Sequence, residues 1–213
     1  DPKNPYANRD PRMRFTMYVD GDALPSGILF KPVPGGGGGD EIGKTQYNTT
    51  TGFSLKKYVS AEDFANPGAS GLNFILLRYA EVLLTYAEAK IELNQIDATV
   101  YDAINKIRTR SDVGLPALST GLTQAELRAV VRRERTLELA FEGIHLFDIR
   151  RWKTAQQVMT GKVFGITYYS GANPITVEVP SVIRTFDASK HYLWPVPQKE
   201  KTLNPTLGQN PGW

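Results

Sequence analysis

Residues 72–94 read LNFILLRYAEVLLTYAEAKIELN, without an interrupting glycine or proline. Good helix formers dominate this stretch, so we expect one continuous helix from Leu72 to Asn94. Its polar side chains recur at spacings of three and four and form one narrow strip: Arg78, Glu81, Thr85, Glu88 and Glu92. The rest of the helix surface is apolar, so other elements must cover it on several sides.

A second helix is predicted after a short linker around Gln95-Ile96. Asp97 can cap its first turn. Its buried stripe is expected to contain Val100, Ala103, Ile104 and Ile107. Because the linker is short, the two helices fold back antiparallel and resemble one tetratricopeptide-type hairpin. Helical repeats need about three units to close a core. Either other parts of this chain complete the stack or the remaining repeats are missing from it, and we expect the second.

A third helix begins at the capping box Thr123-Gln-Ala-Glu126 and is expected to run through Glu142. A short fourth helix, Leu146–Lys153, follows Gly143. The apolar face of the third helix should consist of Leu127, Val130, Leu137 and Phe141. Glu134 lies on that same face, where a carboxylate is costly unless it is paired. We take its partners from the arginines nearest in sequence: Arg132, Arg133, Arg135, Arg150 and Arg151.

The flanking segments hold most of the glycine and proline. Short strands are predicted at Arg14–Val19, Ile28–Phe30 and Thr176–Val179. The run of five glycines at 35–39 is expected to be unusually flexible. The chain is therefore expected to form one domain, 1–213, with a loop-rich segment at 1–71, a helical segment at 72–153 and a loop-rich segment at 154–213.

The predicted fold class is mainly α: a tetratricopeptide-like stack of helical hairpins with an irregular part that carries short strands. The composition agrees with an ordinary soluble globular protein, since 41% of the 213 residues are hydrophobic and 22% are charged. Charge interrupts every long apolar stretch, so no membrane span is predicted. The chain starts with Asp1 and has no secretory signal, so we expect a processed or truncated product.

The charge pattern argues against nucleic acid as a partner. The net charge is +3, from 25 basic and 22 acidic residues. These charges are interspersed along the chain, and the one dense basic group is Arg132-Arg133 with Arg135. The chain contains no cysteine, which excludes disulfides and thiol chemistry.

The glycine-rich stretch contains a match to the phosphate-loop pattern G-x-x-x-x-G-K-[ST], with Gly38, Gly43, Lys44 and Thr45 in register. A working phosphate loop follows a buried strand and opens a helix. Here Val33-Pro34 precedes the match, and a segment poor in helix formers follows it. We therefore expect no nucleotide site and no cofactor.

Glu142-Gly-Ile-His145 has the E-x-x-H spacing of a carboxylate-bridged di-metal site, but such a site needs a second E-x-x-H motif. The other histidine, His191, has no matching glutamate. Because arginines surround these glutamates, we interpret them as members of structural ion pairs and expect no metal. No catalytic residue is predicted either: there is no nucleophile elbow, and no pair of carboxylates suggests a glycosidase.

Aromatic residues in polar loops are the better functional signal. Tyr47 and Phe53 follow the glycine run, and Tyr168-Tyr169 precede Ser170-Gly-Ala-Asn-Pro174. Flat rings can stack on the apolar face of a sugar, while nearby polar groups bond its hydroxyls. The alternative is that these rings only cover the edges of the core. The candidate ligand-binding residues are Tyr47, Phe53, Tyr168 and Tyr169.

Several longer motifs resemble the SusD/RagB family, in order and over nearly the whole chain. They are Asn8-Arg-Asp-Pro-Arg12, residues 74–89, Arg133–Gly143, Asp148-Ile-Arg-Arg-Trp152, Tyr192–Glu200, Asn204-Pro and Gln209–Trp213. The resemblance implies the C-terminal portion of an α-helical fold that contains four tetratricopeptide-like hairpins. In such a fold the Arg/Glu/Trp motifs are fold determinants, and no ligand contact is carried over to a matched position.

The resemblance also implies a function. Members of the family are similar to nutrient-binding lipoproteins on the outer-membrane surface of Bacteroidetes. They cap a TonB-dependent transporter and deliver glycans, or in some cases peptides, to it. The leading hypothesis is therefore a non-catalytic oligosaccharide-binding protein, anchored by a lipid outside this chain. The alternatives are a helical-repeat module for protein partners, a peptide-binding member of the family and, third, a glycan-cleaving enzyme.

Overall fold

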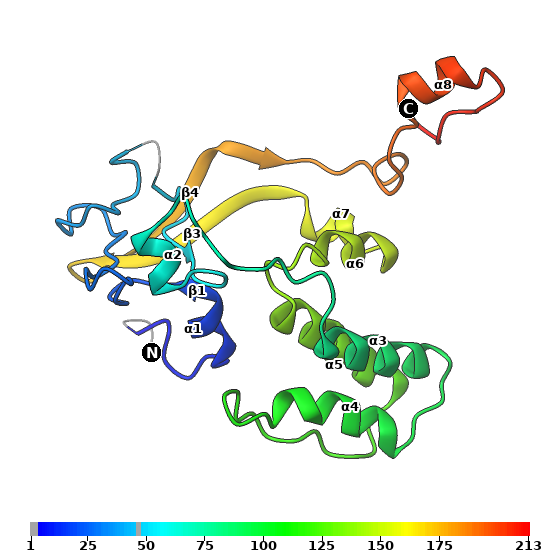
Figure 1. Cartoon of the computed structure of the whole chain (residues 1–213), viewed down its shortest axis with the longest axis horizontal. Coiled ribbons are helices and arrows are strands. Elements are labelled where there is room, and N and C mark those ends of the chain that lie inside the picture. Colours follow the sequence, from blue (N-terminus) through cyan, green and yellow to red (C-terminus); the bar gives the residue numbers. More distant parts are fainter. Residues whose placement is uncertain (1–3, 46–47) are drawn as a thin grey trace. The chain divides into compact units, whose positions relative to one another are not determined.

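A computed structural model describes residues 4–45 and 48–213 of the chain (Figure 1). The described residues form two compact units. The first contains the residues up to His145 together with Gly165–Val177, and the second contains Leu146–Phe164 and Glu178–Trp213. Among these described residues, no helix has both the length and the apolar character needed to cross a membrane.

The core of the first unit is built by three helices: α3 (Tyr79–Glu92), α4 (Ala98–Arg108) and α5 (Gln124–Glu138). α3 packs against both α4 and α5, and the three lie together in Figure 1. The predicted hairpin is confirmed. The Asp97 side chain accepts a hydrogen bond from Thr99 N at 3.0 Å and caps α4. All four residues of the predicted stripe are buried: Val100, Ala103, Ile104 and Ile107.

The prediction that the first helix begins at Leu72 is wrong. α3 begins at Tyr79, and Arg78 before it has an extended backbone, with φ −139° and ψ 159°. The preceding apolar residues are exposed; Leu76 exposes 87% of its surface. The Arg78 guanidinium bonds two glutamates of the segment 138–142, which fixes its backbone at the helix cap. Helix propensity is a weak preference that such tertiary contacts override.

The polar strip of α3 faces α5. Thr85 Oγ1 accepts a hydrogen bond from Arg135 at 3.0 Å, and Glu88, which is buried, lies 3.6 Å from the same guanidinium. One turn further on, Glu92 pairs with Arg128 at 2.7 Å. α3 and α5 therefore contact each other both through these polar pairs and through the apolar core.

The capping box of α5 is confirmed, since Thr123 and Glu126 bond each other's backbone amides. The predicted end of the helix at Glu142 is wrong, because α5 ends at Glu138 with Leu139 as its cap. Phe141 then adopts a left-handed conformation, with φ 62°, and exposes 57% of its surface. It was expected on the apolar face, but the chain has already left the helix there.

The N-terminal segment differs from the predicted strand at Arg14–Val19. It forms α1 (Arg12–Thr16) followed by β1 (Met17–Tyr18), which pairs antiparallel with β2 (Ser54–Leu55). Just before the helix, Asp10 accepts a hydrogen bond from Arg12 N through Oδ1 at 3.0 Å. The second predicted strand, Ile28–Phe30, is reduced to one bridge between Leu29 and Ala23. An unpredicted short helix, α2 (Ala61–Ala65), is capped by Ser60.

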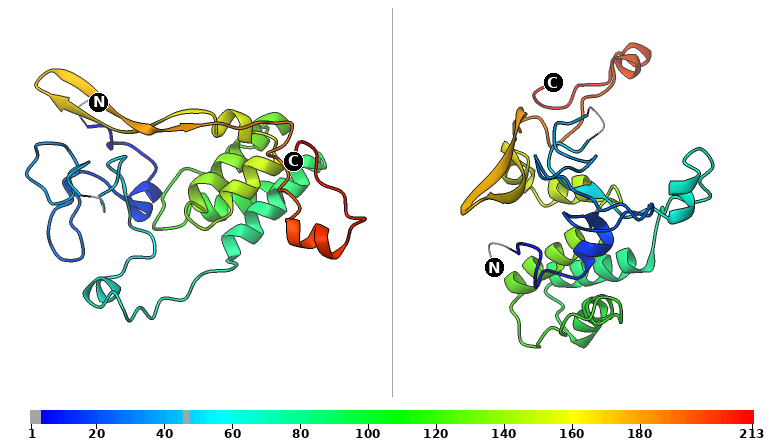
Figure 2. Two further views of the ribbon diagram at one scale, coloured as in Figure 1. Left: turned by 90° about the horizontal axis from the view of Figure 1, so that it is seen from above. Right: turned by 90° about the vertical axis from the view of Figure 1, so that its left-hand side faces the viewer.

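Two long strands follow the helices: β3 (Gly161–Ser170) and β4 (Asn173–Arg184). They form a two-stranded sheet, seen from two further sides in Figure 2. The predicted strand Thr176–Val179 lies within β4. No strand was predicted for β3, since glycines at 161 and 165 weaken its strand pattern.

The second unit contains the rest of α6 (His145–Arg151), α7 (Ala155–Val158) and α8 (Gln198–Leu203). The predicted fourth helix is thus confirmed with shifted ends. Arg150 lies over the Trp194 ring at 4.1 Å and donates from Nε to Tyr192 O at 3.2 Å. Arg151 pairs with Asp148 at 2.7 Å. These two arginines therefore stabilise the second unit. The prediction that they pair with Glu134 is wrong.

Candidate functional site

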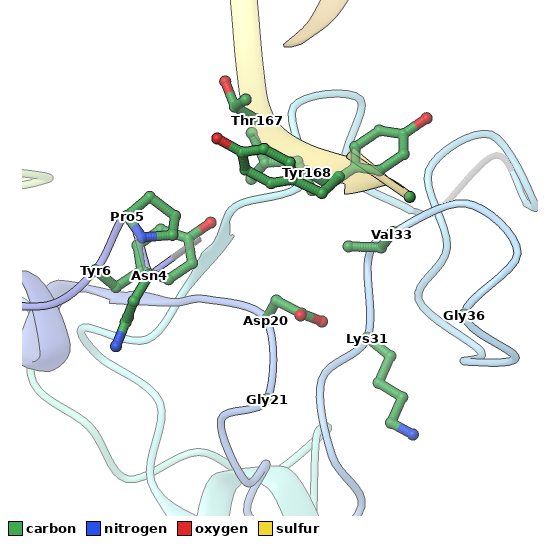
Figure 3. Close-up of a pocket in the computed structure, with 13 residues that line it drawn as sticks. Asn4, Pro5, Tyr6, Asp20, Gly21, Lys31, Val33, Gly36, Thr167 and Tyr168 are labelled. Carbon is green, nitrogen blue, oxygen red and sulfur yellow. The ribbon is translucent and has the colours of Figure 1, made fainter. Parts of the chain in front are cut away.

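A cavity of about 710 Å³ opens in the first unit (Figure 3). Three segments that are distant in sequence form it: the start of the chain, the loops around 20–36 and the tip of β3. Its lining consists of Asn4, Pro5, Tyr6, Asp20, Gly21, Lys31, Val33, Gly36, Ile166, Thr167, Tyr168, Tyr169 and Gly171. We call it the tyrosine cavity.

The tip of β3 is fixed by close backbone packing. Ile166 N donates to Thr51 O at 2.7 Å, and a Cβ at Gly165 would lie only 2.1 Å from that oxygen. Gly52, with φ 80°, leaves room for the buried Ile166 side chain. Only glycine fits at 165, because any side chain would collide with backbone. This packing places Tyr168 and Tyr169 on the cavity wall.

The facing wall carries Asp20 and Lys31 (Figure 3). Its loop is closed by backbone bonds from Gly21 N to Phe30 O, at 2.9 Å, and from Phe30 N to Asp22 O, at 2.8 Å. Phe30 is buried beside the Tyr18 ring, with the two ring centroids 6.4 Å apart. A small apolar core therefore supports this polar wall from behind.

Asp20 is the carboxylate of the cavity, and it makes no hydrogen bond with the part of the chain that is described. Although Asp20 reaches solvent, partial desolvation by the walls raises its pKa, and the charge of Lys31 opposes that rise. Burial also raises the pKa of Tyr6, and the Asp20 charge adds to this effect. The cavity thus combines three phenol rings with one carboxylate that is available as a hydrogen-bond acceptor.

The structure brings together half of the predicted ligand residues. Tyr168 and Tyr169 both line the tyrosine cavity. Phe53 lies outside it, half-buried just before β2. Tyr47 lies outside the described residues. The facing groups Asn4, Tyr6, Asp20 and Lys31 were not predicted. Asp20-Gly21-Asp22 has the composition of a turn, but nothing in the sequence links that turn to β3.

The interpretation of the glutamates as ion-paired is confirmed, although their partners are not the expected ones. Glu134 accepts from Arg12 at 2.8 Å and pairs also with Arg108. These cations come from α1 and α4. Two of the expected partners on α5, Arg132 and Arg135, pair instead with Glu92 and Glu88 of α3.

Two further glutamates extend this buried network. Glu138 accepts from Arg78 at 2.8 Å, from Arg110 at 2.9 Å and from Arg12 at 3.3 Å. Glu142 accepts from Arg78 Nε at 2.7 Å and pairs with Lys57. A cavity of about 280 Å³ borders the network, but the Glu138 carboxylate on its wall is held by these guanidinium groups. The network ties α1, α3, α4 and α5 together.

The pKa values of these carboxyls follow from their partners. Burial alone would raise the pKa of Glu138, but the bonds from Arg110 and Arg78 outweigh it and hold the pKa below its usual value. The same balance, with Arg78 and Lys57, lowers the pKa of Glu142. Both groups are thus stabilised as anions. In the described part of the chain, no three His, Cys, Asp or Glu side chains are grouped so that they could hold a metal ion.

The glycine run folds into a closed loop. Gly35 N, three residues before the phosphate-loop match begins, donates to Glu41 Oε2 at 3.1 Å, so a carboxylate inside the match is bonded within the loop. Lys44 Nζ donates to Gly38 O at 2.8 Å and lies 3.7 Å from Glu41. The lysine of the pattern is therefore engaged within the loop.

Comparisons of the sequence and of the structure with known proteins all identify the same family. Residues 1–213 match the sequence profile described as the SusD family. "SusD-like protein P2" of Formosa agariphila is 34% identical over 154 residues, which are 70% of this chain and 27% of that protein.

Solved structures give the same result. A SusD-like carbohydrate-binding protein of Bacteroides fragilis is 32% identical, with a TM-score of 0.79 over 98% of this chain and 43% of that one. A second SusD-like protein of Bacteroides fragilis is 29% identical, with a TM-score of 0.78 over 98% of this chain and 40% of that one. The predicted fold class is thereby confirmed, and the chain spans less than half the length of these relatives. It belongs to the SusD family.

Proposed function

We propose that this chain is the C-terminal part of a non-catalytic glycan-binding protein, and that the tyrosine cavity contributes to its oligosaccharide site. The observation that carries the proposal is the grouping of Tyr6, Tyr168 and Tyr169 around the Asp20 carboxylate. Binding sites for small ligands are concave, with apolar walls and a few convergent polar groups. The rings would stack on the apolar face of a sugar, and Asp20 would accept hydrogen bonds from its hydroxyls.

The similarity to the SusD-like carbohydrate-binding protein of Bacteroides fragilis supports a carbohydrate as the ligand. Isothermal titration of the full-length protein against a panel of oligosaccharides tests the proposal. Binding of at least one glycan is expected, without release of cleavage products. If no glycan gives heat, the proposal is wrong; if the glycan is cleaved and one carboxylate substitution stops the cleavage, the non-catalytic assignment is wrong.

The family membership supports a place for the protein in nutrient uptake. In this proposal the full-length protein is lipid-anchored at the outer-membrane surface and passes its glycan to a TonB-dependent transporter. Its partners are the glycan, the transporter and the membrane, with no role for nucleic acid. Surface labelling of intact cells and co-purification with the transporter test this part. Labelling only after lysis would contradict the surface location, and absence of the transporter from the purified complex would contradict the partnership.

A protein partner is the second candidate, and the exposed face of α3 favours it. Tyr79, Val82, Tyr86 and Leu93 recur along one side of the helix, and each exposes more than 40% of its surface. A broad apolar helix face is a typical surface for protein contacts. Charged substitutions at Val82 and Tyr86 should leave glycan affinity unchanged; if they abolish capture of the transporter, this face is a protein interface.

A further inference from the structure

The wall of the tyrosine cavity opposite β3 continues directly into the glycine run. Lys31, Val33 and Gly36 line the cavity, and the run occupies residues 35–39. A chain of five glycines has an unusually large number of accessible backbone conformations. Some contact must therefore restrict it if the wall is to keep one shape.

Glu41 supplies that contact from inside the loop. Its Oε2 accepts a hydrogen bond from Gly35 N at 3.1 Å, and its own backbone oxygen accepts from Asn48 Nδ2 at 2.8 Å. The side chain exposes only 16% of its surface. Bonding to the amides of Gly35 and Gly37 and the charge of Lys44 lower the pKa of Glu41, so the carboxylate is an anion at neutral pH.

The loop that Glu41 closes is packed against the cavity wall. Gly38 is buried, and a Cβ placed there would lie 2.6 Å from both the Cβ and the backbone oxygen of Lys31. Ile42 N donates to Pro32 O at 3.0 Å on the other side of the loop. Restricting the loop therefore restricts the segment 31–36, which carries three of the cavity residues.

We propose that Glu41 is a positioning residue of the tyrosine cavity: its carboxylate binds the amide edge of the glycine loop and so holds Lys31, Val33 and Gly36 on the wall. The ligand part of this inference rests on the proposed function. Glu41 does not touch the ligand. It acts by keeping the site in its binding shape, which reduces the conformational freedom lost on binding.

The test uses the full-length protein with Glu41→Ala, Glu41→Gln and the control Asp40→Ala. Asp40 is the adjacent carboxylate, and it makes no hydrogen bond with the described residues. Amide hydrogen exchange of the segment 31–44 is measured without ligand, the melting temperature shows whether each variant folds, and titration gives the affinity for glycans that the wild type binds.

We expect Glu41→Ala to speed exchange across the segment at an unchanged melting temperature and to weaken glycan binding roughly tenfold. Glu41→Gln keeps an acceptor oxygen for Gly35 N and should retain much of the slow exchange and of the glycan affinity. Asp40→Ala should match the wild type.

Unchanged exchange in Glu41→Ala overturns the inference whether or not any glycan binds. Faster exchange with unchanged affinity also overturns it, but leaves the proposed function intact. A wild type that binds no glycan contradicts the proposed function, and exchange still decides whether Glu41 holds the loop.

Discussion

Glu134 has its charge neutralised by side chains from two other helices. It exposes 2% of its surface and is bonded by Arg12 of α1, 122 residues away in sequence, and by Arg108 of α4. A buried charge that loses its partner is strongly destabilising, because neither water nor another group replaces the lost bonds. Removing Glu134 leaves the buried Arg12 with fewer compensating carboxylates.

Glu134→Ala should therefore lower the free energy of unfolding by about 3–5 kcal/mol. Urea denaturation of the full-length protein measures the change. Glu62→Ala, at an exposed position of α2, is the matched control and should cost less than about 1 kcal/mol. A Glu134→Ala variant as stable as the control would show that this carboxylate does not stabilise the fold.

The same network predicts how stability depends on pH. The pKa values of Glu138 and Glu142 are lower in the folded protein than the ordinary value of 4.5, so the unfolded state takes up protons first as the pH falls. Their stabilisation is fully present above about pH 4.5 and is lost as the pH falls through the folded-state pKa values. Denaturation midpoints measured between pH 7 and pH 3 should fall mainly below pH 4.5, and less steeply in Glu138→Gln.

Sequence alone could predict that these glutamates are paired, but not with which cations. The rule that buried charges need partners is local and general. The choice of Arg12, Arg78 and Arg108 depends on which helices meet, and that is decided by the whole core. Proximity in sequence indicated the arginines of α5 and α6, but Arg132 and Arg135 pair with α3, and Arg151 pairs within α6.

At the scale of elements, helix caps are the features that sequence specifies best. The Thr123 side chain accepts from Glu126 N, and the Glu126 carboxylate accepts from Thr123 N at 2.8 Å. Thr123→Ala should lower the free energy of unfolding by about 1 kcal/mol, since it leaves an amide of the first turn without its acceptor. Chemical denaturation measures this loss. Thr120→Ala, three residues earlier and exposed, should have no measurable effect; equal losses in both variants would show that the capping box is not stabilising.

The position of α3 makes a second prediction. Leu84 is fully buried in the hydrophobic core, whereas Leu76 exposes 87% of its surface in the segment that precedes the helix. Leu84→Ala should cost about 2–5 kcal/mol of stability, because it leaves a cavity in the core. Leu76→Ala should cost less than about 0.5 kcal/mol in this chain. If thermal or urea unfolding gave both substitutions a similar cost, the start of α3 at Tyr79 would be wrong.

The helices that sequence predicted well are those with a cap and a clear apolar stripe, namely α4 and the start of α5. The secondary-structure predictions are wrong where a tertiary contact overrides a local conformational preference. Arg78 leaves the helical pattern to bond Glu138 and Glu142, which delays the start of α3. β3 was missed because its pairing with β4 compensates for two glycines that are unfavourable in an isolated strand.

At the scale of the whole molecule, the candidate site is a product of folding. Tyr168 and Tyr169 could be predicted as binding residues from the sequence, because they are aromatic residues in a polar segment. Tyr6 and Asp20 reach them only because the tip of β3 docks on Thr51 and because a loop folds back at Phe30. No periodicity or motif connects positions that are about 150 residues apart, so sequence alone identified only one side of the cavity.

The affinity of the full-length protein for its glycan, compared between wild type and the variant Tyr168→Ala/Tyr169→Ala, is the most direct test of the proposed site. Both rings line the cavity, whereas Phe53 lies outside it, so Phe53→Ala is the control. The double variant should keep its melting temperature and lose at least about tenfold in affinity, since stacking of each ring is removed. Wild-type affinity in the folded double variant would contradict glycan binding at the tyrosine cavity.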